Sequence, residues 1–155
     1  MRLALLLALA LPLAACDAVG GSDDLSDEDR TAIETAFSCA DVEAAPVGGS
    51  RSGTLGADDC RAAGSTFLAD HYAFRLDAAA TLTFVIDAPD FTPLVALRTA
   101  QNGRIASSSA EGTTEGTADG FRVTLTQTLT PGLYVVAATT VVNGAGGAYT
   151  LRIDD

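Results

Sequence analysis

The alternation of apolar and polar side chains after about residue 53 constrains the fold of this chain most strongly. Five segments place apolar residues at every second position: 71–76, 81–86, 121–125, 133–138 and 148–153. A period of two puts successive side chains on opposite faces of a strand. Each run therefore has one apolar face, as an antiparallel sheet that is buried on one side requires. Short strands at regular spacing, with no helical pattern after residue 40, predict an all-β antiparallel sandwich.

Turn-forming residues separate these runs. Pro, Gly, Asn and Asp cluster at 88–90, 102–103, 130–132 and 143–144. The pair Asn102-Gly103 predicts a two-residue hairpin turn between strands at 94–99 and 104–106, because both residue types tolerate positive φ. The Pro/Gly/Ser-rich stretch 44–53 and the polar stretch 107–120 are predicted to be loops.

The first fifteen residues have the pattern of an export signal. Arg2 precedes a run of thirteen mostly Leu and Ala residues, which span only about 20 Å as a helix and so suit a signal peptide better than a membrane span. The run ends in Leu-Ala-Ala-Cys at 13–16, which resembles the lipobox of bacterial lipoproteins. That resemblance implies that residues 1–15 are removed and that Cys16 carries the lipid. The protein would be anchored to the inner or outer bacterial membrane, facing the periplasm or the cell surface. An ordinary signal peptide with a free thiol remains the alternative.

A short helix is expected between the anchor and the strands. Residues 16–25 are small, polar and acidic, and we expect them to form a flexible tether. Ser26 precedes three acidic residues, a combination typical of a helix N-terminus. Ile33 and Phe37 lie one turn apart and give an apolar stripe, which predicts a helix at about 27–38 within a segment of helix and loop at 26–49. This helix either packs on the domain or frays as a linker.

Cys39 and Cys60 remain once Cys16 is assigned to the lipid. Two cysteines in an exported protein predict a disulfide bond. Two free thiols or a bond to another molecule are the alternatives. A metal site is disfavoured, because the spacing does not match a Cys-x-x-Cys pattern and His71 is the only histidine.

The charge balance excludes one class of function, and the single histidine limits another. The chain has nine Arg, no Lys and 20 acidic residues, for a net charge of −11, which excludes a nucleic-acid partner. His71 lies at a polar-face position of its strand, where we expect a surface or cross-strand residue. No catalytic residues are assigned. A small hydrolase that uses His71 as its base is the remaining enzymatic alternative.

Short motifs in residues 50–155 resemble the bacterial pre-peptidase C-terminal domain. They occur in the family's order at 53–60, 70–76, 80–84, 90–106, 130–134 and 147–151, and include Asp-His-Tyr-Ala-Phe-Arg-Leu, Pro-Gly-Leu-Tyr and Gly-Ala-Tyr-Thr-Leu. The resemblance implies a jelly-roll-like β-sandwich domain over 50–155 without catalytic residues. Such domains usually follow a secreted peptidase, and some relatives bind calcium or collagen. In this chain we expect a lipid anchor and one helix in place of the peptidase.

The acidic residues offer a calcium hypothesis. Calcium takes six to eight oxygen ligands, and Asp58, Asp59 and Asp70 would converge at one end of the sandwich. Turns also favour Asp for its local hydrogen bonds, so a purely structural role for these residues is the alternative. No cofactor other than calcium is expected. We expect a lipid-anchored, non-enzymatic module of the bacterial cell envelope for adhesion, scaffolding or protein interaction, with an envelope protein or a glycan as partner. The alternative is a calcium- or carbohydrate-binding module that serves a separate exported enzyme.

Overall fold

The computed structural model describes residues 25–39, 41–62, 65–109, 115–117 and 120–155. The predicted signal segment 1–15, Cys16 and residues 17–24 lie outside this range. The described elements are α1 (Asp27–Phe37), β1 (Val42–Ala44), β2 (Gly49–Leu55), β3 (Ala69–Leu76), β4 (Ala80–Ala88), β5 (Pro93–Thr99), β6 (Arg104–Ser109), β7 (Glu115–Thr117), β8 (Gly120–Leu129), β9 (Gly132–Thr140) and β10 (Gly147–Asp154).

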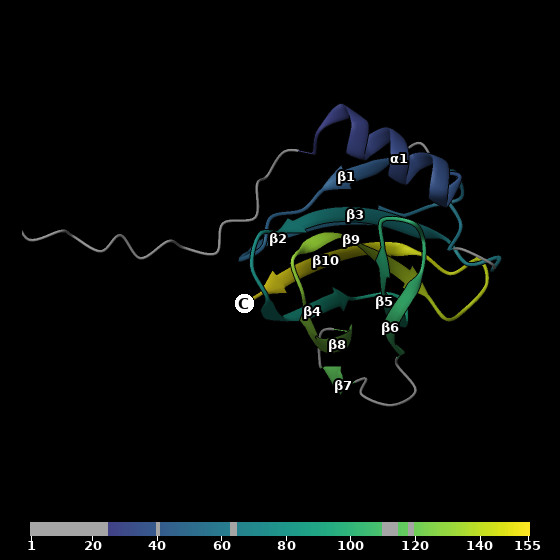
Figure 1. The fold of residues 1–155 in the computed structure, drawn as a ribbon. Helices are drawn as coiled ribbons and strands as arrows, with labels where there is room; N and C mark the ends of the chain where they lie inside the picture. The colour runs from purple at the N-terminus through teal and green to yellow at the C-terminus, as the bar shows by residue number, and fades with distance from the viewer. Residues whose placement is uncertain (1–24, 40, 63–64, 110–114, 118–119) are drawn as a thin grey trace, which may run out of the picture.

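The strands form two five-stranded sheets that pack face to face (Figure 1). We call the sheet β1-β3-β9-β5-β6 the helix-covered sheet, and the sheet β2-β10-β4-β8-β7 the open sheet. Among the residues that the structure describes, all paired strands are antiparallel except β1 with β3. The chain crosses between the sheets repeatedly from β2 to β10, in the strand order of a jelly roll. This confirms the predicted all-β, antiparallel, jelly-roll-like sandwich with a short N-terminal helix.

The main core lies between the two sheets. Alternate side chains of β3, β4 and β10 are buried there, as their sequence pattern predicts: Tyr72, Phe74, Leu76, Leu82, Phe84, Ile86, Tyr149, Leu151 and Ile153. The rings of Phe74 and Phe84 lie 5.6 Å apart between their centroids, which joins the two sheets at the centre. Removing this apolar surface from water is the main contribution to the stability of the sandwich.

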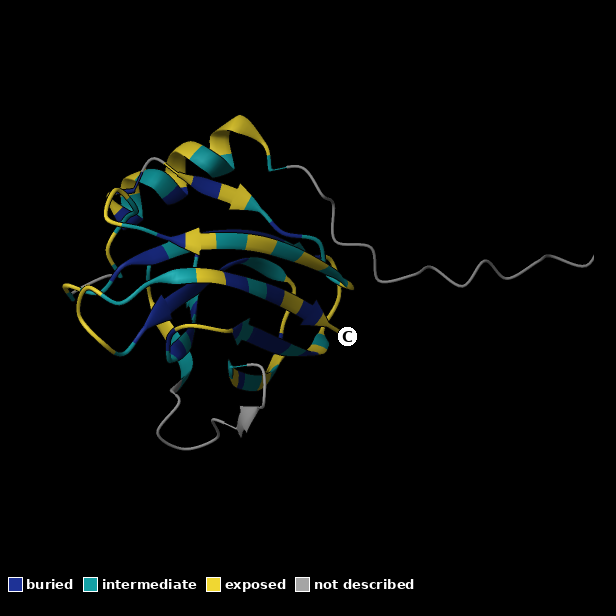
Figure 2. Ribbon diagram, turned by 180° about the vertical axis from the view of Figure 1, so that it is seen from behind, coloured by how far each residue is buried: buried dark blue, intermediate teal, exposed yellow. Residues whose placement is uncertain are grey.

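A second, smaller core lies on the outer side of the helix-covered sheet. Ile33 and Phe37 of α1 pack with Ala73 and Val135. Residues 134–140 of β9 are consequently all buried, on both faces of the strand. Along β2 and β10 of the open sheet, by contrast, exposed residues alternate with less exposed ones (Figure 2). The expectation of one apolar face for every strand is therefore wrong for β9, because a helix covers the face that would otherwise meet solvent.

The helix is held at both ends. At its start, the Ser26 side chain accepts a hydrogen bond from the Asp29 amide, and Asp29 also pairs with Arg75 of β3 at 2.6 Å. At its end, Ser38 adopts a left-handed conformation and Cys39 forms a disulfide with Cys60. The structure confirms the helix and the disulfide, and it favours the packed helix over a frayed linker.

Three predicted loop assignments are wrong in part. The stretch 44–53 contains the end of β1 and most of β2, and the stretch 107–120 contains the end of β6, all of β7 and Gly120 of β8. The predicted turn at Asn102-Gly103 is longer than two residues, since β5 ends at Thr99 and β6 begins at Arg104. Only Asn102 has positive φ there. Strands at sheet edges pair through backbone groups, so they need no apolar alternation.

Across the residues that the structure describes, we find no helix with the length and apolar character that a membrane crossing requires.

Candidate functional site

The two outer faces of the sandwich differ in what covers them. The helix α1 lies on one, whereas the other, formed by β2, β10, β4 and β8, carries exposed or half-buried polar side chains. Strand register aligns four of these side chains in one row across the open sheet: Ser52, Thr150, Asp87 and Arg122. The row ends in an ion pair between Arg122 Nε and Asp87 Oδ1 at 2.5 Å.

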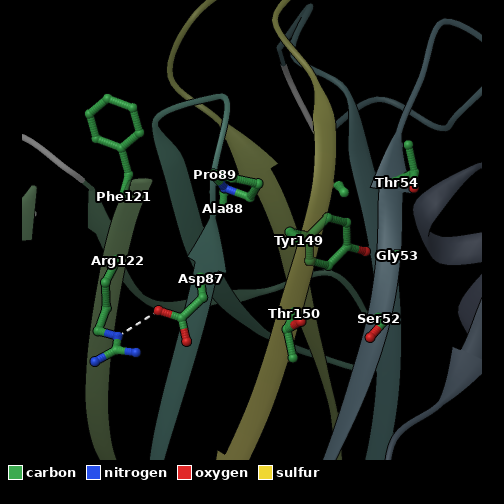
Figure 3. Close-up of a pocket in the computed structure, with 11 residues that line it drawn as sticks. Ser52, Gly53, Thr54, Asp87, Ala88, Pro89, Phe121, Arg122, Tyr149 and Thr150 are labelled. Carbon is green, nitrogen blue, oxygen red and sulfur yellow. Dashed lines mark hydrogen bonds and ion pairs between the residues drawn. The ribbon is translucent and has the colours of Figure 1, made fainter. Parts of the chain in front are cut away.

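A groove of about 850 Å³ runs over this row (Figure 3). It lies toward the end of the sandwich where β4 ends and β8 and β10 begin, and its lining includes Thr54, Pro89 and Phe121. Phe121 is 37% exposed and is one of two large apolar side chains described as exposed. Hydroxyl groups, an ion pair and an aromatic ring are therefore available to one bound partner.

A buried hydrogen-bond network lies under the groove. The Tyr149 hydroxyl donates to Asp70 Oδ2 and lies 2.7 Å from the Tyr72 hydroxyl. Tyr149 reaches these partners across Gly53, which has no side chain to block the ring (Figure 3). Burial raises the pKa of Asp70 to about 6 and that of Tyr72 to about 12. The pKa of Tyr149 is also raised, first by burial. The network thus anchors the inner side of the groove.

An acidic pocket of about 300 Å³ lies beside this network. Two of the three calcium candidates, Asp59 and Asp70, line it together with Asp41 and Glu43. Asp58 is exposed and is not among the lining residues. One Asp59 oxygen accepts a hydrogen bond from the Gly56 amide at 2.6 Å. The structure thus brings together two of the three residues, and calcium binding stays a prediction.

His71 is buried, so the expectation of a surface residue is wrong. Only 2% of it is exposed, and the Phe37 ring contacts it edge-on with centroids 5.1 Å apart. Burial, and to a smaller extent the nearby Arg98 charge, lower its pKa to about 4. His71 is not among the residues that line the groove. The alternation along the strand correctly places His71 on the face that points away from the main core, but α1 covers that face.

The residues of the groove were not singled out by sequence reasoning. Ser52, Asp87 and Thr150 come from three different strands, and only the strand register aligns them. The alternation of polar residues in each strand was the available signal. It shows which side of a strand faces solvent, but not which residues of neighbouring strands lie next to one another. Cys39 and Cys60 were predicted to pair, and the disulfide is typical of exported proteins.

Eleven chains of solved structures are similar to this chain, and two of them illustrate the likeness. The chain is similar to the pre-peptidase C-terminal domain of a collagenase from Bacillus anthracis, with 17% identity and a TM-score of 0.49, over 73% of this chain and 92% of that one. It is also similar to PliG, a periplasmic inhibitor of g-type lysozyme from Aeromonas hydrophila, with 12% identity and a TM-score of 0.40, over 68% and 84%. No protein-family model and no curated protein matches the chain. The assignment of the fold rests on the sheet topology, and membership of the pre-peptidase C-terminal family stays a prediction.

Proposed function

We propose that this chain is a lipid-anchored, non-catalytic binding module of the bacterial envelope that holds a partner protein against the open sheet. The observation that supports this proposal is the difference between the two outer faces. A helix and a disulfide cover one face, while the other presents a groove with an exposed aromatic ring, Phe121, and the Asp87–Arg122 ion pair. Aromatic and arginine side chains are the residues most often enriched at protein interfaces.

The position of the groove suits an anchored module. Asp29 at the start of α1 pairs with Arg75 near the end of β3, so the helix begins at the end of the sandwich where β3 leads into β4. The groove lies at the opposite end, where β4 ends and β10 begins. The chain that leads from a lipid on Cys16 would therefore join the domain at the end remote from the groove. This arrangement would leave the groove accessible to a partner.

Site-specific crosslinking in cells tests the binding face. A photoreactive amino acid replaces Ala148, an exposed residue in the groove, or Ala79, an exposed residue in the turn at the other end. We expect a defined crosslinked product from position 148 and none from position 79. The amount of crosslinked product from position 148 should fall when the same chain also carries Phe121→Ala. Equal products at both positions, or none at 148, would contradict the proposal.

The lipid anchor is tested by metabolic labelling with a fatty-acid analogue. The native chain should take up the label, and the Cys16→Ser chain should not. A Cys16→Ser chain that still labels would place the lipid elsewhere and would remove the anchoring part of the proposal.

A glycan is the second candidate partner. The aligned hydroxyl and charged groups of Ser52, Thr150 and Asp87 could exchange hydrogen bonds with sugar hydroxyls, and the Phe121 ring could pack on a sugar face. A panel of soluble envelope polysaccharides, tested by calorimetry against the native chain and Phe121→Ala, separates this case from a protein partner. Binding by the native chain that is lost in the variant favours the glycan.

Calcium binding is the other form of this second candidate function, a calcium- or carbohydrate-binding module that serves a separate exported enzyme. A rise in the melting temperature on adding calcium, reduced by Asp70→Asn and retained by Asp58→Asn, would support a calcium site in the acidic pocket. No rise would exclude calcium as a stabilising ligand.

A further inference from the structure

The histidine beside the disulfide lacks a hydrogen-bond partner that its burial demands. His71 is 2% exposed, and its Nδ1 atom makes no hydrogen bond within the described structure. Nearly all buried polar groups in proteins have such a partner, so an exception calls for an explanation. The Phe37 ring contacts His71 edge-on, and His71 also lines the acidic pocket together with Asp59 and Asp70.

Three side chains that ligate soft metal ions meet at this point. The two Sγ atoms of Cys39 and Cys60 and a ring nitrogen of His71 all lie within 4.8 Å of one another. They come from three separate parts of the chain: the end of α1, the segment before β3, and β3 itself. The disulfide occupies both sulfur atoms in the oxidised protein, so the three side chains cannot bind a metal together in that state.

We propose that reduction of the Cys39–Cys60 disulfide opens a Cys₂His site for a thiophilic metal ion, with zinc as the probe. A dithiol reductant supplies two electrons and two protons. The S–S bond breaks, Cys39 and Cys60 become thiols, and the reductant becomes a disulfide. Zinc then binds both sulfurs as thiolates and releases their two protons, while neutral His71 donates a nitrogen lone pair. Water fills the fourth position, an arrangement that zinc accepts.

The geometry needs only small shifts. Zinc lies about 2.3 Å from sulfur and about 2.0–2.1 Å from nitrogen, which places its ligand atoms roughly 3.3–3.8 Å apart in a tetrahedron. The two sulfurs must move apart once their bond is broken, and the imidazole nitrogen already lies within 4.8 Å of both. The backbone atoms of the two cysteines are separated by 5.7 Å at Cα, so rotation of the side chains can supply the movement.

The site would keep the helix attached to the domain in a reducing environment. In the oxidised protein, the disulfide ties the end of α1 to the segment before β3. A metal ion held by Cys39, Cys60 and His71 would replace this covalent link between the same two segments. Metal binding would then stabilise the reduced protein, because a ligand that binds only the folded state shifts the unfolding equilibrium.

The test compares oxidised and reduced forms of the full chain with Cys16→Ser, so that only two thiols can form. A water-soluble phosphine reduces the disulfide without competing strongly for zinc, and is oxidised to its phosphine oxide. Zinc binding is followed by calorimetry, and cobalt serves as a spectroscopic substitute, since thiolate ligation gives an intense near-ultraviolet band. We expect one zinc per reduced chain, a raised melting temperature and this cobalt band, and none of the three in the oxidised form.

Two variants identify the ligands. His71→Leu, which removes both ring nitrogens, should weaken zinc binding by the reduced chain at least tenfold, and Cys60→Ser should weaken it more. If His71→Leu does not fold, His71→Gln takes its place with circular dichroism as the check. The proposal is overturned if the reduced chain binds no zinc, if the histidine variant binds as tightly as its parent, or if the oxidised chain binds equally well.

Discussion

Gly53 is the residue whose replacement tests the network under the groove most directly. A Cβ atom built at Gly53 would lie 2.5 Å from Cζ and 2.8 Å from Cε1 of Tyr149, and closer still to its hydroxyl oxygen. Nonbonded carbon atoms normally lie about 3.5–4.0 Å apart. In Gly53→Ala the ring must therefore move by roughly 1 Å. Tyr149 is 3% exposed and is held by Asp70 and Tyr72, so this movement of the ring would disturb its hydrogen bonds.

The expected cost follows from these contacts. Overpacking of a buried site costs about 1–3 kcal/mol, and disturbing one hydrogen bond of the network adds about 1 kcal/mol. The lower entropy of the unfolded chain with Ala offsets about 0.5 kcal/mol. We therefore expect Gly53→Ala to lower the free energy of unfolding by about 1.5–3.5 kcal/mol, measured by urea denaturation with circular dichroism.

Gly56→Ala is the matched control. A Cβ atom at Gly56 meets no atom within 4 Å, and its φ is not in the positive range. The control should be as stable as the native chain or slightly more stable. A Tyr149→Leu background should reduce the cost of Gly53→Ala, since the clashing ring is gone. If Gly53→Ala and Gly56→Ala have the same stability, the proposed role of Gly53 is refuted.

Three further changes test other parts of the structure. Replacing Cys39 and Cys60 by Ala should cost about 3 kcal/mol, because the bond closes a loop with a sequence separation of 21; unchanged urea midpoints in the double variant would refute this. The raised pKa of Asp70, from 3.8 to about 6, means that the native chain loses stability as pH rises from about 4 to 6. Asp70→Asn should remove that loss and gain about 1–2 kcal/mol at pH 7 after allowance for partial exposure, and a variant less stable than the native chain at pH 7 would contradict it. Hydrogen bonds from Ser26 and Arg75 lower the pKa of Asp29, so its contribution is present near neutral pH and is lost as pH falls below about 4. Asp29→Asn should therefore cost less than about 1 kcal/mol at pH 7 and nothing at pH 2, and an equal cost at both pH values would speak against the ion pair.

The sequence predicts the inner faces of the sandwich well and its outer faces poorly. Phe74, Phe84 and Leu151 occupy the core because alternation is a local property of each strand. The burial of His71 depends on where a helix some forty residues earlier in the chain comes to rest. No local pattern contains that information.

The residues of the groove could not be predicted from the sequence for a related reason. Its central row depends on the register of four strands, and two of these, β2 and β10, are far apart in the chain. The prediction of the disulfide, by contrast, needed only the count of cysteines and the predicted export signal. Candidate residues that depend on composition were therefore found, and those that depend on long-range pairing were not.

The disulfide also determines how the domain would respond to mechanical force. If the chain is pulled between Leu25 and Asp155, tension passes from Cys39 directly to Cys60 through the sulfur atoms. The intervening loop, which includes β1 and β2, carries no load while the bond is intact. Extending the reduced chain would release about 70 Å more contour length, at roughly 3.4 Å for each of the 21 residue steps. If the proposed lipid anchor and partner pull on the domain between these two points, β1 and β2 would thus bear no load until the bond is reduced.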